Sequence, residues 1–298
     1  MAAPAPPVPP KLPPPPRVEG VGRRTRLRTD QRVHALVPAR LDLALHRRRA
    51  RRRADLAAAE AAMEDVVGAT PRAGEIPELA RRYVDARAER EALLWRPSIF
   101  RPPHLAGEEH ARAAESAPGG VVIVFGHLSS YVSVFAAVRA VLGPAYAVGS
   151  ARHFLAADRG ADALVIQRTR AVIVGLGHPF IPAPGSMEVL ETALRAGRAV
   201  AIAFDVPGRT PVDLLGRRRF VAAGPSRLAA RTDSTILPVI TRNDGPRVEA
   251  EFRPPLRAQP GEEPAALEQR VADAFAPFVL DRPWSIQDPH DRWALDIG

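Results

Sequence analysis

The pattern of apolar positions in residues 118–298 predicts strands that alternate with helices. The stretch from Val121 to Phe125 is continuously apolar and follows Gly119 and Gly120, which is typical of a strand buried on both faces. Similar short runs predict strands over residues 145–148, 171–174, 199–204, 236–240 and 248–252. Helical spacing between these runs predicts helices over residues 129–142, 154–168, 186–195, 225–231 and 265–278. The alternation favours the α/β class, with a mixed, mostly parallel sheet flanked by helices.

The N-terminal third has a different pattern. Nine prolines lie within residues 1–17, and such a run forms neither helix nor sheet, so we expect residues 1–39 to be a disordered Pro/Arg-rich arm. Helical spacing begins near residue 40 and continues to about residue 67, with an apolar stripe through Leu41, Leu45, Leu56 and Met63. We therefore expect a single α/β domain over residues 40–298, in which N-terminal helices at 40–100 precede a sheet core at 118–298.

The charge is concentrated in this N-terminal region. Residues 1–60 hold 14 Lys and Arg against 5 Asp and Glu, whereas the two signs balance in the rest of the chain. Six of the arginines lie between Arg47 and Arg53. A basic segment of this kind, here residues 17–53, suits an anionic membrane surface, an acidic carrier protein or, less well, RNA. The alternative is a solvated basic face that only maintains solubility.

Two absences narrow the class of protein. The chain has no cysteine, which excludes a thiol nucleophile, a disulfide scaffold and cysteine-ligated metal sites. It also has no apolar run of about 18 residues and no signal peptide. We expect a cytoplasmic protein that is peripheral on the inner face of the cell membrane.

His127 is the main candidate for chemistry. It follows the predicted strand at 121–125 directly, and ligands of α/β sheets bind at the carboxyl ends of the strands. A histidine held there by a rigid backbone suits a general base, although a lone histidine in this position is often structural. Ser129 and Ser130 follow it, but no Gly-x-Ser-x-Gly elbow surrounds them, so a serine hydrolase is disfavoured.

The sequence Gly126-His127-Leu128-Ser129-Ser130-Tyr131, behind the apolar run, resembles the first motif of the lysophospholipid acyltransferase superfamily. The resembling branch is that of the bacterial lipid A lauroyl/myristoyl and phosphatidylinositol mannoside acyltransferases. Further segments resemble the same branch in the same order: 194–200 with Phe204-Asp205, 212–220, 224–225 with 228–232, 236–239, 282–284 and 290–293. The resemblance covers roughly residues 50–293.

The resemblance implies an acyltransferase that uses an acyl thioester of CoA or of an acyl carrier protein, with no metal and no further cofactor. In the family, a histidine deprotonates the acceptor, and a carboxylate five residues later orients its ring. His127 then corresponds to the general base, and Ser129, Ser130 and Tyr131 beside it to substrate-binding residues. Arg168 or Arg170 would hold a phosphate or the developing oxyanion, and Arg209 an anionic headgroup. His290 and Arg292, in contrast, are expected to pack and cap the end of the domain.

The chain departs from the family pattern at the orienting carboxylate, because the fifth residue after His127 is Val132. One hypothesis is that Asp205, which follows another buried strand, replaces it. A second is that His127 acts alone on a stronger nucleophile, such as an amine. A third is that the protein is an inactive homologue that only binds acyl chains or lipids. His153 and Asp158 form an alternative pair with the family spacing, and a transferase with an RNA-borne donor also remains open.

Overall fold

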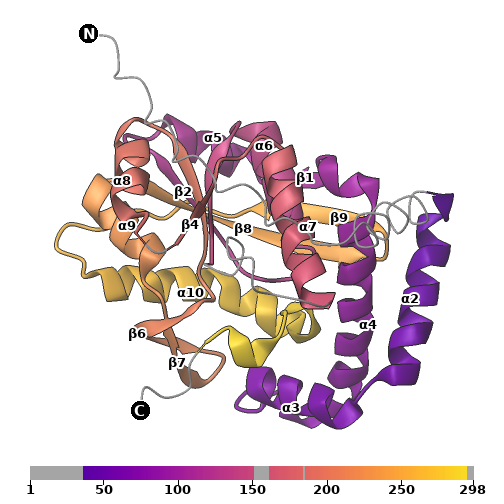
Figure 1. Cartoon of the computed structure of the whole chain (residues 1–298). Helices are drawn as coiled ribbons and strands as arrows, with labels where there is room; N and C mark the ends of the chain where they lie inside the picture. The colour runs from indigo at the N-terminus through magenta and orange to yellow at the C-terminus, as the bar shows by residue number, and fades with distance from the viewer. Residues whose placement is uncertain (1–35, 151–160, 184, 294–298) are drawn as a thin grey trace.

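The computed structural model describes residues 36–150, 161–183 and 185–293, and a seven-stranded sheet with the order β1-β9-β8-β2-β5-β3-β4 lies at its centre (Figure 1). Neighbouring strands are parallel except β8 and β9, which form an antiparallel hairpin. The expected mixed, mostly parallel α/β sheet is confirmed. The strands are β1 (His104–Ala106), β2 (Val121–Phe125), β3 (Ala145–Gly149), β4 (Phe180–Pro182), β5 (Ala199–Ala203), β8 (Thr235–Asp244) and β9 (Arg247–Phe252).

Helices cover both faces of the sheet, because both faces of its central strands are apolar. Val122 and Val124 of β2 point into one core cluster, and Ile123 and Phe125 point into the other. The first cluster contains α8 (Met187–Arg195), α9 (Gly224–Thr232) and α10 (Pro264–Asp281). The second contains residues of α5 (Glu108–Ser116), α6 (Ser133–Val141) and α7 (Ala161–Gly175).

Three helices form the N-terminal segment of the described chain: α2 (Ala39–Arg53), α3 (Leu56–Val67) and α4 (Ile76–Trp95). α2 and α4 lie side by side at one edge of the molecule (Figure 1). Ion pairs join them, since Arg47 contacts Glu89 and Arg51 contacts Asp85. The expected N-terminal helical segment is therefore present, and the proposed arm falls almost entirely on residues 1–35, outside the described part of the chain.

The predicted apolar stripe of this segment is wrong for three of its four residues. Met63 is fully buried in the core, but Leu41, Leu45 and Leu56 are 53%, 45% and 47% exposed. The single expected helix is broken at Ala54 and Asp55, so the spacing from α2 does not continue into α3. Paired charges and the buried Leu43 hold α2 instead.

One further expectation was wrong, and one hairpin was not predicted. The apolar run at residues 171–174 is the end of helix α7 and not a strand, because a short apolar run looks alike in a buried helix and a buried strand. An antiparallel hairpin of β6 (Pro207–Leu214) and β7 (Arg217–Val221) was not predicted, since its strands are rich in charged and polar residues. Of the predicted helix over 154–168, residues 154–160 lie outside the described residues.

Among the described helices, none combines the length and the apolar character that crossing a membrane requires.

Candidate active site

The register of two parallel strands brings His127 and Asp205 together. β2 and β5 pair so that Phe125 lies opposite Ala203, the last residue of each strand. His127 and Asp205 each follow two residues later, and Phe204 N–H donates to Phe125 O at 3.0 Å, so the two chains leave the sheet side by side. Both residues therefore emerge at the carboxyl edge of the sheet, where α/β proteins bind their ligands.

Asp205 contacts His127 with both carboxylate oxygens. Oδ1 lies 2.8 Å from His127 Nδ1, and Oδ2 accepts from the main-chain N–H of His127 at 2.7 Å. The Asp205 side chain is fully buried, whereas 18% of the His127 side chain is exposed. One carboxylate thus fixes both the backbone and the ring of the histidine, and the ring keeps access to the surface.

Electrostatics keep Asp205 ionised. Burial opposes ionisation, but the charge of His127, the hydrogen bonds from His127 and the charge of Arg292 outweigh it, so the pKa of Asp205 lies below its ordinary value. An ionised carboxylate only accepts hydrogen bonds, so Nδ1 of His127 must donate. In the neutral ring the unprotonated nitrogen is then Nε2, which is the arrangement that a general base requires.

The turn after His127 is anchored from both sides. Ser129 has a positive φ of 48°, which is uncommon for a residue with a side chain, and its N–H donates to Ser285 O at 2.7 Å. Ser130 N–H donates to Asn243 Oδ1 at 3.3 Å, and both serines are buried. Ser129 and Ser130, expected to bind substrate, are thus occupied at their main-chain N–H groups in holding the turn.

Tyr131 packs directly on the imidazole. The ring centroids of Tyr131 and His127 are 4.7 Å apart, and Tyr131 also stacks on Phe125 at 6.0 Å. Burial raises the pKa of the Tyr131 hydroxyl, while the charge of Arg292 and a hydrogen bond with Thr169 oppose the rise. Tyr131 is therefore neutral and forms an apolar wall beside the ring of His127.

Val132 does not lie in a polar site. It is 4% exposed and belongs to an apolar cluster with Leu94, Ile99 and Val172. These neighbours come from α4, the short 3₁₀ turn after it and α7. The position where the family pattern has a carboxylate is thus filled here by hydrophobic packing, and Asp205 supplies the carboxylate that contacts His127.

Arg168 is used in packing between elements. Its Nε–H donates to Leu94 O at 3.0 Å, and its guanidinium lies over the rings of Trp95 and Phe100 at 5.9 and 5.1 Å. Burial lowers the pKa of Arg168, and the side chain is 7% exposed. These contacts tie α7 to α4 and leave the predicted role in binding an anion without geometric support.

Arg170 and Arg209 have opposite environments. Arg170 is 8% exposed, and burial lowers its pKa. Arg209 is exposed on β6, four residues after Asp205. The expected binding roles of both arginines stay predictions. The alternative pair His153 and Asp158 lies outside the described residues.

A strap formed by the C-terminal residues 285–293 completes the site, and sequence reasoning missed its role. Gln287 N–H donates to His127 O at 2.8 Å, and Arg292 Nε–H donates to Gln287 O at 2.8 Å. The charge of Arg292 acts on Asp205 and on Tyr131. Arg292 was expected only to cap the domain, whereas it provides a positive charge beside the His127–Asp205 pair. The short strap offered no periodicity that could have placed it there.

Comparison with known proteins places these residues in a family. The family model of the bacterial lipid A biosynthesis acyltransferases matches residues 59–293, a range that includes every residue of the site described above. No curated protein matches the chain. Among solved structures, the 1-acyl-sn-glycerophosphate (LPA) acyltransferase PlsC from Thermotoga maritima is similar over 66% of this chain and 81% of its own, with 14% identity and a TM-score of 0.37.

Proposed function

The chain belongs to the bacterial lipid A biosynthesis acyltransferase family, and we propose that it moves an acyl group from a thioester to a hydroxyl or amine acceptor with His127 as general base and Asp205 as its acidic partner. The donor is the thioester of CoA or of an acyl carrier protein. The acceptor of this family is a lipid, so lipid biosynthesis is the process in which the enzyme acts.

The proposed reaction has one addition and one elimination. Nε2 of His127 takes the proton of the acceptor hydroxyl or amine while the acceptor oxygen or nitrogen bonds to the thioester carbonyl carbon. The tetrahedral intermediate then releases the thiol: the carbon–sulfur bond breaks, and the proton held by His127 passes to the sulfur. Asp205 stabilises the imidazolium that exists between these two events.

The observation that carries this proposal is the double contact between Asp205 and His127. A carboxylate that accepts from Nδ1 at 2.8 Å fixes the tautomer, and its second oxygen, on the main-chain N–H at 2.7 Å, prevents it from turning away. Asp205 thus takes the role of the orienting carboxylate, which valine at position 132 cannot provide. This geometry favours an active transferase over a homologue that only binds acyl chains.

Arg292 is the proposed electrostatic partner of the reaction. The N–H groups of His127, Leu128, Ser129 and Ser130 all donate to protein oxygens, so none is left for an oxyanion. Arg292 is partly exposed and acts on the charge of Asp205. A guanidinium in this position stabilises negative charge that develops on the thioester oxygen.

Acyl transfer tests the proposal with purified wild-type protein and the variant His127→Ala, with acyl-CoA and acyl carrier protein thioesters and with hydroxyl and amine acceptors. We expect His127→Ala to lower the transfer rate by about 10²–10⁴-fold. His104→Ala is the matched control, because His104 is exposed on β1 and its ring faces Glu249 at 3.9 Å. Equal rates for wild type and His127→Ala would reject general-base catalysis and leave a binding protein.

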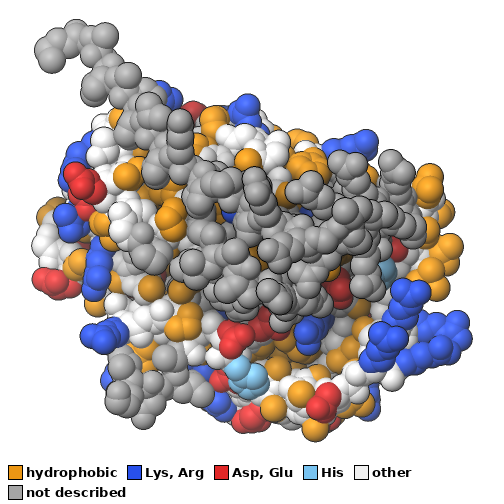
Figure 2. Space-filling view, viewed as in Figure 1, with side chains coloured by type: hydrophobic (Ala, Val, Ile, Leu, Met, Phe, Trp, Pro, Cys, Tyr) orange, Lys and Arg blue, Asp and Glu red, His pale blue; other side chains and the backbone are white. Residues whose placement is uncertain are grey.

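The outer face of α2, which we define as Leu41, Leu45, Arg48 and Arg52, is the proposed contact with an anionic membrane surface. These four residues recur at helical spacing and are exposed. Arg48 and Arg52 have no acidic partner among the described residues, in contrast to Arg47 and Arg51 on the same helix. Figure 2 shows apolar side chains that give way to a cluster of basic ones along the edge formed by α2. Leucines beside arginines suit the boundary between headgroups and acyl chains.

We also propose a peripheral position on the inner face of the cell membrane, and the exposed basic face of α2 supports peripheral binding. The basic residues before α2 lie outside the described part of the chain, so the proposal rests on α2 alone. An acyl carrier protein as donor and RNA as a partner stay predictions.

A further inference from the structure

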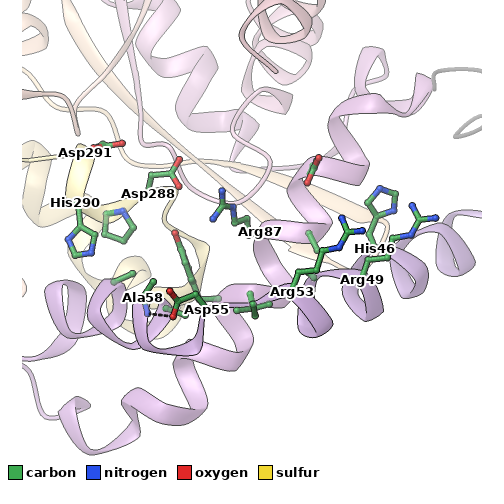
Figure 3. Close-up of a pocket in the computed structure, with 18 residues that line it drawn as sticks. His46, Arg49, Arg53, Asp55, Ala58, Arg87, Asp288, His290 and Asp291 are labelled. Carbon is green, nitrogen blue, oxygen red and sulfur yellow. Dashed lines mark hydrogen bonds between the residues drawn. The ribbon is translucent and has the colours of Figure 1, made fainter. Parts of the chain in front are cut away.

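A cavity of about 770 Å³ lies between α2, α3, α4 and the strap, in the region shown in Figure 3. Its volume falls within the range of about 300–1,000 Å³ that is usual for small-molecule sites. Small apolar side chains line much of it: Ala50, Ala54, Ala58, Ala59, Ala62 and Ala88. We call it the α2 cavity. Short alanine side chains leave it open, so charged residues around them determine what it can bind.

One wall of the α2 cavity is basic. Arg49 and Arg53 reach it from α2, and Arg87 reaches it from α4 (Figure 3). Within the described residues, the side chains of these three arginines take part in no ion pair or hydrogen bond. On the same helix α2, Arg47 and Arg51 are instead neutralised by Glu89 and Asp85 of α4.

The opposite wall is acidic. Asp288 and Asp291 of the strap line the cavity on the side away from Arg49 and Arg53 (Figure 3). Asp288 lies 3.9 Å from Nη2 of Arg292, and its charge also acts on the buried guanidinium of Arg90, whereas Asp291 has no ion pair within the described residues. Asp55 also lines the cavity, but it caps α3 by accepting from Ala58 N–H at 3.1 Å.

The remaining charged groups do not change this division. Glu91 lines the cavity from α4, four residues after Arg87, and offsets part of the basic wall. His46 and His290 also line it, and each lies near a carboxylate, with Asp42 at 3.4 Å and Asp65 at 3.8 Å. Arg49 and Arg53 therefore face the two strap carboxylates across an apolar surface, and Arg87 lies between the two walls (Figure 3).

We propose that the α2 cavity binds a zwitterionic headgroup of the phosphoethanolamine type, with its phosphate on Arg49, Arg53 and Arg87 and its ammonium on Asp288 and Asp291. A bare anion satisfies the guanidiniums but is repelled by the strap carboxylates and leaves Asp291 without a cation. A bare cation satisfies the strap carboxylates but is repelled by the guanidiniums. A ligand that carries both charges, separated by a short apolar linker, complements both walls and the alanines between them.

The strap places such a ligand next to the acyl-transfer site without making it part of that site. Tyr83 lines the cavity, and Tyr131 packs on His127. Gln287 N–H donates to His127 O at 2.8 Å, and the next residue, Asp288, lines the cavity, so the strap contacts both places. A headgroup in the α2 cavity is thus recognised beside the reaction centre by residues that take no part in the proposed proton transfer.

Calorimetric titration of the full-length protein with glycerophosphoethanolamine tests this inference. We expect it to bind at least about tenfold more tightly than glycerol 3-phosphate or ethanolamine, which each lack one of the two charges. The pair Arg49→Gln/Arg53→Gln and the pair Asp288→Asn/Asp291→Asn should each weaken binding about tenfold or more. Arg112→Gln/Arg218→Gln is the matched control, because it removes the same charge from two exposed arginines that do not line the cavity, and it should retain the affinity.

The inference is overturned if glycerol 3-phosphate binds as tightly as glycerophosphoethanolamine, if neither binds, or if the control pair weakens binding as much as the cavity pair. His127→Ala should bind glycerophosphoethanolamine like the wild type, so failure of the proposed catalysis and failure of this site are distinguishable. A short-chain lysophosphatidylethanolamine identifies the source: tighter binding than glycerophosphoethanolamine assigns a lipid-borne headgroup, and equal binding assigns a free compound.

Discussion

Asp205 holds His127 at two points, its ring nitrogen Nδ1 at 2.8 Å and its main-chain N–H at 2.7 Å, although the two residues are 78 positions apart in the chain. The parallel register of β2 and β5 sets this contact, because each residue stands two positions beyond a paired strand end. The contact therefore depends on the sheet and needs no carboxylate on the helix that follows His127. This explains how the site can be complete with valine at position 132.

A glutamate at position 132 should destabilise the protein and should not improve catalysis. Val132 packs against Leu94, Ile99 and Val172, so Val132→Glu buries a carboxyl group among apolar side chains without a partner. We expect a loss of about 2–4 kcal/mol in the free energy of unfolding and no gain in transfer to hydroxyl acceptors. Urea titration and the acyl-transfer assay measure the two effects.

Val132→Leu is the control for size, since it adds volume but no polar group, and it should cost less than Val132→Glu. A stable Val132→Glu protein with faster transfer to hydroxyl acceptors would show that a carboxylate at position 132 can orient His127, and it would contradict the role given to Asp205.

Stability should fall as the pH rises through the range in which Glu268 ionises. Burial raises the pKa of Glu268 to about 7, and its oxygen Oε1 has no hydrogen-bond partner in the described part of the chain. The folded protein then binds a proton that the unfolded chain, with the ordinary value of 4.5, releases. This contribution is full below pH 4.5 and is lost as the pH approaches about 7.

Glu268→Gln removes this dependence and keeps an oxygen that accepts from Ser226 N–H, which now lies 3.3 Å from Oε2. Thermal unfolding at pH 5 and pH 8 should show little difference from the wild type at pH 5 and a gain of up to about 3 kcal/mol at pH 8. Glu60→Gln, on the exposed side of α3, is the control. A Glu268→Gln variant that is no more stable than the wild type at pH 8 would show that ionisation of Glu268 does not lower the stability.

Membrane binding should depend on the outer face of α2. We expect Arg48→Gln/Arg52→Gln to weaken sedimentation with vesicles rich in phosphatidylglycerol, by a factor of about 10–30, because each arginine near an anionic surface contributes about 1 kcal/mol. Arg112→Gln/Arg218→Gln is the control, since these two arginines are exposed on α5 and β7 and do not belong to the outer face of α2. Raising the salt concentration should weaken the wild type in the same way. Vesicle binding that changes neither with the salt concentration nor in the Arg48→Gln/Arg52→Gln variant would falsify this contact.

The core of the fold was predictable because its strands are buried on both faces. The continuous run Val121–Phe125 predicted β2 with its observed ends, and the position of His127 after it followed directly. Residues 199–204 likewise predicted β5, so Asp205 was expected at the same edge of the sheet. The sequence does not predict that β2 pairs with β5 rather than with another strand. This pairing decides whether Asp205 reaches His127.

Other features had no signal of this kind. Arg168 looked like an anion-binding residue, but an arginine that packs on Trp95 and Phe100 has the same local sequence as one that binds a ligand. The strap was missed because hydrogen bonds such as Arg292 to Gln287 and Gln287 to His127 join residues without any periodic pattern. The exposure of Leu41 and Leu45 was missed since helical spacing reveals a face but not what covers it.

A double-mutant cycle on the transfer rate decides whether Asp205 and His127 act together: Asp205→Asn, His127→Ala and the double variant are each compared with the wild type in single-turnover reactions. Asparagine keeps an oxygen for the main-chain N–H of His127 but no longer offers the ionised oxygen to Nδ1. We expect Asp205→Asn to lose about 10²–10⁴-fold in rate and the double variant to be no slower than His127→Ala alone, because the two residues act as one unit. An Asp205→Asn enzyme with the wild-type rate, or a double variant slowed by the product of the two single effects, would contradict this joint action.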